Sequence, residues 1–147
     1  MSLKLRIEND MKNALRAGDK PRLGVVRMAL AAIKQREIDE QKTLDEPEST
    51  AVIEKLIKQR RESVVQFEQA GRDELAAKER AEIEVLAAYL PEQLGDHEID
   101  AVIDAAIAGT GAASMRDMGK VMAEVKRTAQ GRADMSVVSA RVKARLA

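Results

Sequence analysis

Apolar residues recur along the whole chain with the spacing of an α-helix, and no stretch alternates as a β-strand does. The first run consists of Leu3, Ile7, Met11 and Leu15. Residues spaced in this way lie on one face of a helix, and that face is stable only when another element covers it. Aromatic residues make up only 1% of the chain, so the buried faces must be aliphatic. The pattern predicts an all-α protein.

Glycine, proline and polar residues divide the N-terminal part into four expected helices. Gly18 ends the first helix, and Asp19 is a suitable N-cap for the second, with Pro21 in its first turn. The polar stretch 41–50 separates the second helix from the third. Gly71 marks a tight reversal between the third helix and the fourth.

Charged residues interrupt the third apolar run, residues 53–67. Arg60 and Arg61 fall on or beside the stripe, and cations alternate with carboxylates around them. Such interleaving is typical of a solvated helix face, and the apolar runs are too short for a long heptad seam. We therefore do not expect an extended coiled coil.

The segment LPEQLGDHE, residues 90–98, is the expected domain boundary. Pro91 disfavours helical geometry at the residue before it, so the fourth helix should end there. Gly95 adds flexibility, and Asp96 is suited to cap a new helix. Beyond this segment the pattern of apolar runs starts again.

Three shorter helices are expected after the boundary. Their apolar runs lie at residues 99–107, 115–125 and 135–146. The stretch GTGAA breaks the chain after the first run, and Ser114 with Asp117 has the spacing of a capping box. The chain is thus expected to form an N-terminal four-helix domain, 1–94, followed by a small three-helix domain, 95–147.

Positive charge gathers in the last quarter of a chain that has no net charge. The sequence holds 25 Lys and Arg against 25 Asp and Glu. From Thr110 onward, eight Lys and Arg stand against three acids. A local excess of this kind favours an anionic partner for the C-terminal part, while the chain as a whole has no field that would attract one.

The residues needed for unaided catalysis are missing from the pattern. There is no cysteine, and His97 is the only histidine, placed in the boundary segment where a surface role is expected. No phosphate-binding loop, dinucleotide fingerprint or paired-histidine motif occurs. We therefore assign no catalytic, cofactor-binding or metal-binding residue. The lack of cysteine and of long apolar runs predicts a cytoplasmic protein without a membrane partner.

Two glycines accompany the C-terminal cations. Gly119 lies inside a helical run, where it costs about 1 kcal/mol relative to alanine. We expect it to permit close packing of two helices or, less favoured, close approach of a ligand backbone. Gly131 is expected to end the helix as its C′ residue, with the cations of the preceding turns placed favourably for the helix dipole.

The cations around these glycines have two interpretations. They can serve the helix dipole and solubility alone, or they can contact phosphates. Lys and Arg without aromatic partners suit backbone recognition of folded RNA better than stacking on single strands. The candidates for nucleic-acid binding are Lys120, Lys126, Arg127, Arg132, Arg141 and Lys143.

Several segments taken together resemble the GatB/YqeY family. They are RLGVVRMALAAIKQREID, IEKLIKQRRESVVQFEQAGRDELAAKERAEIEVLAAYLPEQL and MRDMGKVMAEVKRTAQGRADMSVVSARVKARL. The resemblance is firmest over the DMGKVM and GRAD stretches of the last segment and extends over essentially the whole chain. Ala123 departs from it, because a glycine is common at that position. The resemblance implies a helical N-terminal domain and a three-helix C-terminal domain.

The resemblance also implies a setting for the protein. Its C-terminal part is similar to the tail of the B subunit of the glutamine-dependent tRNA amidotransferase, which helps to hold the tRNA. Nothing here resembles the large domain in which transamidation occurs. The implied role is a non-catalytic accessory protein that contacts tRNA or the amidation machinery.

Two other functions stay open at this point. The long N-terminal helices could make the chain a protein–protein adaptor, with the basic end serving solubility. The chain could also be a component of a carbon–nitrogen ligase with glutamine as amido-N donor, the label that the family shares with the amidotransferase. The sequence does not predict an oligomeric state.

Overall fold

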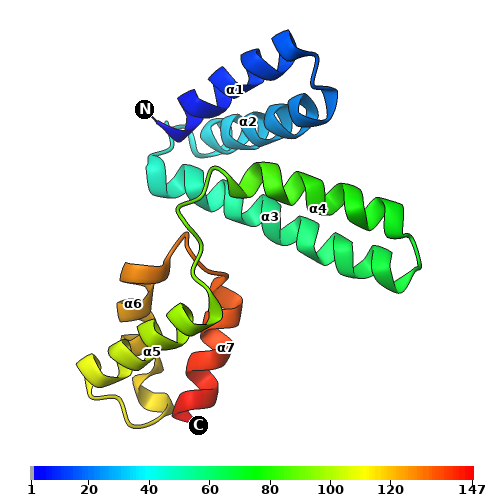
Figure 1. Ribbon diagram of the computed structural model, residues 1–147. Coiled ribbons are helices and arrows are strands. Elements are labelled where there is room, and N and C mark those ends of the chain that lie inside the picture. The colour runs from blue at the N-terminus through cyan, green and yellow to red at the C-terminus, as the bar shows by residue number, and fades with distance from the viewer. Residues whose placement is uncertain (1) are drawn as a thin grey trace. The chain divides into compact units, whose positions relative to one another are not determined.

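Every regular element of the structure, a computed structural model that describes residues 2–147, is helical (Figure 1). The regular elements among these residues are seven α-helices and one 3₁₀ turn, η1, and none of the residues lies in a strand. This confirms the predicted all-α fold. The elements are α1 (Leu3–Ala17), α2 (Lys20–Glu40), α3 (Glu46–Gln69), α4 (Asp73–Ala87), α5 (Asp96–Thr110), η1 (Met115–Asp117), α6 (Met118–Ala129) and α7 (Met135–Leu146).

The chain divides into two compact units, which are described separately. The first ends at Leu90 and holds α1 to α4, and the second runs from Pro91 to Ala147 and holds η1 and α5 to α7. Each unit has its own cluster of buried aliphatic side chains. The division into a 1–94 and a 95–147 domain as independent functional parts stays a prediction.

The first unit consists of two helical hairpins packed on each other (Figure 1). One hairpin is α1 with α2, and the other is α3 with α4. The apolar stripes read from the sequence face inward, and the largest fully buried side chains are Ile7, Val26, Ile33, Ile53 and Leu86. The core of this unit is therefore almost entirely aliphatic, as the composition requires.

The ends of these helices follow their local sequence. Gly18 adopts a left-handed backbone with φ of 69°, and the carboxylate of Asp19 accepts a hydrogen bond from the Arg22 amide. Both predicted caps are confirmed. The break expected over residues 41–50 is shorter, because α3 begins at Glu46 and tolerates a proline in its first turn.

The second unit is a three-helix group around a small core. Its fully buried side chains are Ile103, Val121, Val125, Val138 and Val142. The predicted capping box of Ser114 and Asp117 is present, although it starts η1 rather than α6 itself. The expected GTGAA break begins later than predicted, since α5 continues through Thr110.

The start of α5 also differs from the prediction. Gly95 is the N-cap, and Asp96 is the first helical residue, so Asp96 does not cap the helix. Glu98 makes the reciprocal contact of a capping box with the Gly95 amide. Asp96 is thereby left to interact elsewhere.

Gly131 is the residue after the C-cap of α6 and adopts a φ of 80°. The prediction that it ends this helix is confirmed, because left-handed geometry at C′ favours glycine. Its carbonyl accepts a hydrogen bond from the Gln93 side chain at 2.9 Å, and the Leu94 amide donates to the Arg132 carbonyl at 2.7 Å. The segment before α5 is thus held against the turn after α6.

Candidate functional site

Two arginines of α7 lie against an acidic stripe on α5. Arg141 Nη2 is 2.6 Å from Asp96 Oδ1, and Arg141 Nη1 is 3.3 Å from Asp100 Oδ1. Arg145 forms ion pairs with Asp100 and Asp104. The three aspartates are spaced by four residues, so they share one face of α5. These ion pairs join the first and last helices of the unit.

This arrangement gives Arg141 a structural role. Its guanidinium hydrogen-bonds Asp96, and this bond together with the charge of Asp100 raises the pKa of Arg141. The side chain is 29% exposed and is shared between two carboxylates. A phosphate would have to compete with both of them. Arg141, predicted as a nucleic-acid contact, is therefore poorly placed to act as one.

Arg132 is also engaged within the unit. Its Nε donates to the Glu92 carbonyl at 3.2 Å, and its own carbonyl accepts from Leu94. These two bonds tie the segment before α5 to the turn between α6 and α7. Part of the donor capacity of Arg132 is thus used in holding the backbone together.

Unlike Arg132 and Arg141, the cations at the start and along the outer surface of α6 are not held by other elements of the unit. Arg116, Lys120, Lys126 and Arg127 are all exposed. Arg127 pairs only with Glu124, one turn away, and its side chain stays 76% exposed. Within the described residues, the side chains of the other three make no hydrogen bond or ion pair. We call these four residues the α6 cationic face.

The spacing of the three cations of α6 places them together. Lys120 and Arg127 are seven residues apart, which returns an α-helix to nearly the same direction, and Arg116 belongs to η1, directly before α6. Lys126 lies on the adjacent stripe, above Gly119 and Ala123. Lys143, the remaining candidate, is exposed on α7, and its ammonium makes no hydrogen bond or ion pair to other residues of 2–147.

Gly119 does not do what was predicted for it. It is exposed, and a Cβ atom built on it would meet no atom within 4 Å. The prediction that it allows two helices of this chain to pack closely is wrong. Gly119 and Ala123 instead form a low strip on the surface between the long cationic side chains. Such a strip leaves room for the backbone of a ligand, which was the less favoured interpretation of this glycine.

The carboxylate of Asp117 organises the η1 turn that precedes α6. It accepts hydrogen bonds from the amides of Ala113, at 2.9 Å, and Ser114, at 3.4 Å. These bonds, with a smaller contribution from the charge of Lys120, lower the pKa of Asp117. The carboxylate of Asp117 therefore stays ionised while it caps η1.

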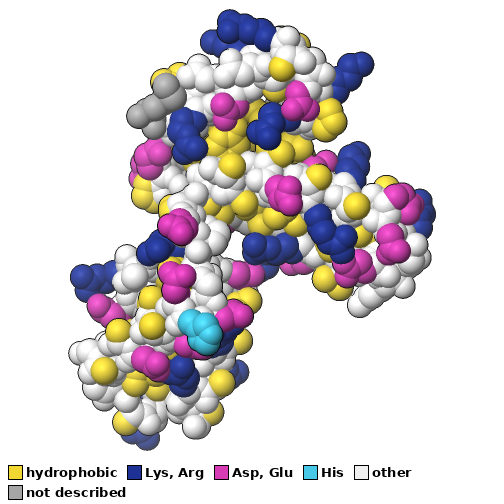
Figure 2. Space-filling model, viewed as in Figure 1, with side chains coloured by type: hydrophobic (Ala, Val, Ile, Leu, Met, Phe, Trp, Pro, Cys, Tyr) yellow, Lys and Arg dark blue, Asp and Glu magenta, His cyan; other side chains and the backbone are white. Residues whose placement is uncertain are grey.

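Other candidates are simple to place. His97 is exposed, as expected, and is the cyan side chain at the surface in Figure 2. Over residues 2–147 no three His, Asp or Glu side chains are grouped so that they could hold a metal ion. The helices described here include none long and apolar enough to cross a membrane.

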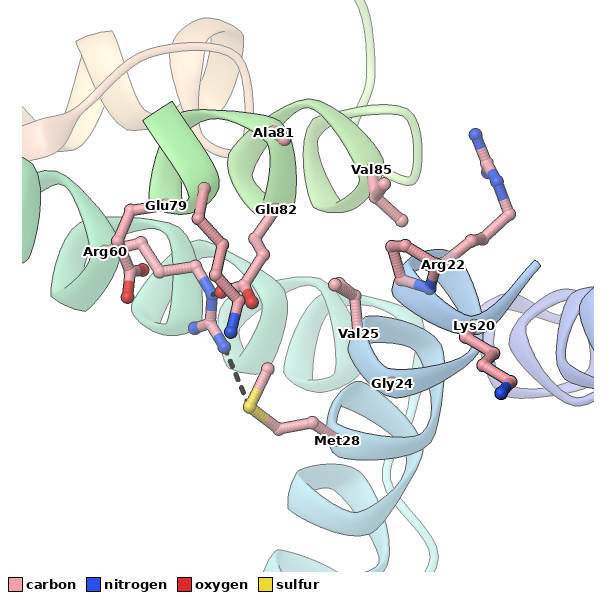
Figure 3. A pocket seen from close by; sticks show the side chains of 12 residues that line it. Lys20, Arg22, Gly24, Val25, Met28, Arg60, Glu79, Ala81, Glu82 and Val85 are labelled. Atoms are coloured by element: carbon pink, nitrogen blue, oxygen red, sulfur yellow. Dashed lines mark hydrogen bonds and ion pairs between the residues drawn. The ribbon is translucent and has the colours of Figure 1, made fainter. Parts of the chain in front are cut away.

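One feature of the first unit escaped the sequence reasoning. Arg60 is only 8% exposed and lies at a groove of about 580 Å³ between α2 and α4 (Figure 3). The only signal was its position on or beside an apolar stripe. Its partner Glu82 belongs to another helix, and no spacing rule links the two residues.

Fold and site together define an all-α protein of two helical units, the second of which presents a cationic helix. Residues 4–146 match the family described as Yqey-like protein. The chain therefore belongs to the Yqey-like family, as the resemblance in the sequence suggested.

Relatives in fungi carry the name "Altered inheritance of mitochondria protein 41, mitochondrial". The protein of Pyrenophora tritici-repentis is 32% identical over 140 residues, which cover 93% of this chain and 77% of that protein. The protein of Eremothecium gossypii is 39% identical over 85 residues, 57% of this chain and 46% of the relative. The protein of Saccharomyces cerevisiae strain YJM789 is 34% identical over 95 residues, 64% and 51% respectively. The matches to the two yeast proteins thus span about half of each relative.

Proposed function

We propose that this chain is a non-catalytic accessory protein whose second unit contacts the phosphate backbone of folded RNA, with tRNA as the expected partner. The contact surface is the α6 cationic face, with Gly119 and Ala123 as the strip against which the backbone lies. Family membership supports the tRNA assignment only through the resemblance of the C-terminal part to the amidotransferase tail. Contact with the amidation machinery is part of the same proposal.

One observation carries the proposal. Positive and negative residues of the second unit are equal in number, eight of each, yet they are segregated. Helix α5 carries four acids and no Lys or Arg, and its aspartates form ion pairs with Arg141 and Arg145 of α7. The α6 cationic face stays net positive because, among residues 2–147, only Arg127 of its four cations forms an ion pair, with Glu124. A neutral unit thereby presents a local positive surface.

A salt titration tests the proposal. Full-length protein is titrated into labelled bulk tRNA at several salt concentrations, with fluorescence anisotropy as the readout. We expect weak binding whose logarithm falls linearly with the logarithm of salt concentration, because phosphate contacts release counterions. Replacing Lys120 and Lys126 together by alanine should reduce the magnitude of this slope by roughly 1.5 to 2.

The matched control removes two exposed lysines of the first unit. Lys12 and Lys55 lie on α1 and α3, and their double replacement by alanine changes the net charge by the same amount. This control should leave the slope unchanged. Equal effects of the two pairs, or no salt-dependent binding at low ionic strength, would refute the proposed surface.

The compartment is also a proposal. A chain without cysteine suits a reducing compartment, and we propose the cytoplasm. The relatives' names place those proteins in mitochondria, which makes the mitochondrion the competing location. Fractionation of cells that express the untagged protein distinguishes the two.

A further inference from the structure

The groove in the first unit is walled by two neighbouring helices. It lies between the N-terminal half of α2 and the middle of α4, and has a volume of about 580 Å³. Figure 3 shows Val25 of α2 and Val85 of α4 on opposite walls, with Arg60 at one end and Lys20 and Arg22 toward the other. The remaining apolar lining is Pro21, Met28 and Ala81.

The residues of each wall have helical spacing. On α2 they are Pro21, Gly24, Val25 and Met28, and on α4 they include Lys78, Ala81, Glu82 and Val85. Each wall therefore presents positions i, i+3 or i+4, and i+7. Two turns of helix are about 10 Å long. This length matches the apolar anchors of an amphipathic helix bound in a groove.

The rim of the groove is predominantly cationic. Lys20, Arg22 and Lys78 line it, and Glu79 is the one acidic lining residue outside the Arg60–Glu82 pair among those described. Arg22 is 3.6 Å from Asp19 in an exposed pair. The ammonium groups of Lys20 and Lys78 form no hydrogen bond or ion pair with residues 2–147. An occupant with carboxylates beside an apolar face is complementary to this rim.

The buried guanidinium of Arg60 adds a hydrogen-bond donor to the groove. Its Nε donates to Glu82 at 3.1 Å and its Nη1 to the Leu56 carbonyl at 3.0 Å. Among residues 2–147, its Nη2 meets only the sulfur of Met28, at 2.7 Å (Figure 3). A thioether is a weak acceptor, and methionine is flexible, so an incoming carboxylate could replace it.

Gly24 marks where an occupant can come closest. It is exposed in the interior of α2, and a Cβ atom there would meet nothing within 4 Å. Glycine destabilises a helix relative to alanine. Because no neighbouring atom lies close to Gly24, packing within this unit does not explain why a glycine occupies this position. Because glycine has no side chain, the backbone of a bound partner can approach the α2 side of the groove closely at Gly24.

From these observations we propose that the groove binds an acidic amphipathic helix of a partner protein. Apolar side chains of that helix fill the space between Val25 and Val85, and its carboxylates meet Lys20, Lys78 and Arg60. A nucleic-acid backbone does not suit an apolar floor. This inference is independent of the RNA contact proposed for the second unit, and neither depends on the other.

The test uses a displayed library of short helix-forming peptides panned against the full-length chain. Enriched peptides should have apolar residues at i, i+3 or i+4 and i+7, flanked by Asp or Glu. The best peptide is then labelled and its affinity measured by fluorescence anisotropy. Replacing Lys20 and Lys78 together by Glu should weaken binding at least about tenfold, since two rim attractions become repulsions.

The control and a second variant guard against misfolding. Replacing Lys12 and Lys55 by Glu gives the same charge change outside the groove and should leave peptide affinity within about twofold. Gly24→Leu should lower affinity at least about tenfold while the thermal midpoint does not fall, because the position is open. tRNA binding should be unaffected by Gly24→Leu.

Three results would overturn the proposal. The first is a library that yields no helical binder or yields basic ones. The second is an enriched peptide whose affinity is unchanged both by the replacement of Lys20 and Lys78 with Glu and by Gly24→Leu. The third is self-association that Gly24→Leu abolishes, which would make a second copy of this chain the occupant.

Discussion

At the scale of single residues, the environment decides what each cation does. Arg141 and Lys126 look equivalent in the sequence, because both lie in basic helices near the C-terminus. Arg141 meets carboxylates 41 and 45 residues away, whereas Lys126 meets none in the part of the chain that the structure describes. The sequence could locate the cationic region, but it could not separate cations that stabilise the fold from those available to a ligand.

Gly119→Ala separates stability from binding. The added methyl group meets no atom within 4 Å, and alanine favours the helix, so the free energy of unfolding should rise by up to about 1 kcal/mol. If an RNA backbone lies against this strip, Gly119→Leu should weaken tRNA binding while the fold stays intact. Thermal melting and anisotropy measure the two effects. A variant that melts lower than the unmodified protein would contradict the open environment of Gly119.

Replacing one partner of the buried Arg60–Glu82 pair should destabilise the protein more than replacing both. Arg60→Met leaves Glu82 without its cation in a partly buried place and should cost about 2 kcal/mol of unfolding free energy, a figure reduced because Glu82 is partly exposed. Adding Glu82→Met should recover much of that loss, because both charges are then gone. Urea denaturation of the two single variants and the double variant gives the coupling energy. Strictly additive effects would show that the pair does not interact.

At the scale of elements, the helices were predictable because each boundary carries a local signal. Gly18, Asp19, Gly71 and Gly131 all lie where a helix ends or starts. The errors at Asp96 and over GTGAA occurred because alternative caps stood next to each other in the sequence. The groove could not be predicted, since it depends on which faces of α2 and α4 are left uncovered.

The α5–α7 ion pairs should stabilise the second unit without serving RNA. Arg141→Gln should lower the thermal midpoint of this unit, because Asp96 then loses its ion pair and Asp100 keeps only the more distant one with Arg145. High salt should reduce the difference between the two proteins. The salt slope of tRNA binding should stay unchanged. A reduced slope in Arg141→Gln would show that Arg141 contacts phosphate after all.

Acid should weaken the first unit where α1 and the α2–α3 connection meet. Glu37 hydrogen-bonds Lys4 Nζ at 2.7 Å and the Leu44 amide at 2.9 Å, and these bonds lower the pKa of Glu37. A lowered folded-state pKa means that the stabilisation is complete above the ordinary pKa of glutamate, about 4.3, and is lost as pH falls through the lower folded value. Glu37→Gln should therefore be less stable at neutral pH and lose less stability in acid. Thermal melts between neutral pH and pH about 2 test this, and parallel profiles for both proteins would contradict it.

At the scale of the whole molecule, the two units carry different surfaces. The first has an apolar groove with a cationic rim, and the second has the α6 cationic face. Sequence reasoning reached the family, the all-α fold and the cationic region, because these depend on local pattern. It did not reach the groove or the true environment of Gly119, because these depend on tertiary contacts.

The most direct measurement is an amide NMR map of the full-length protein during titration with tRNA. We expect the largest changes on residues 116–127, with Gly119 and Lys120 among them, while the acidic face of α5 at Asp100 stays nearly unchanged. Changes that centre on α5, or that spread evenly over both units, would contradict the central claim that the α6 cationic face is the RNA-binding surface.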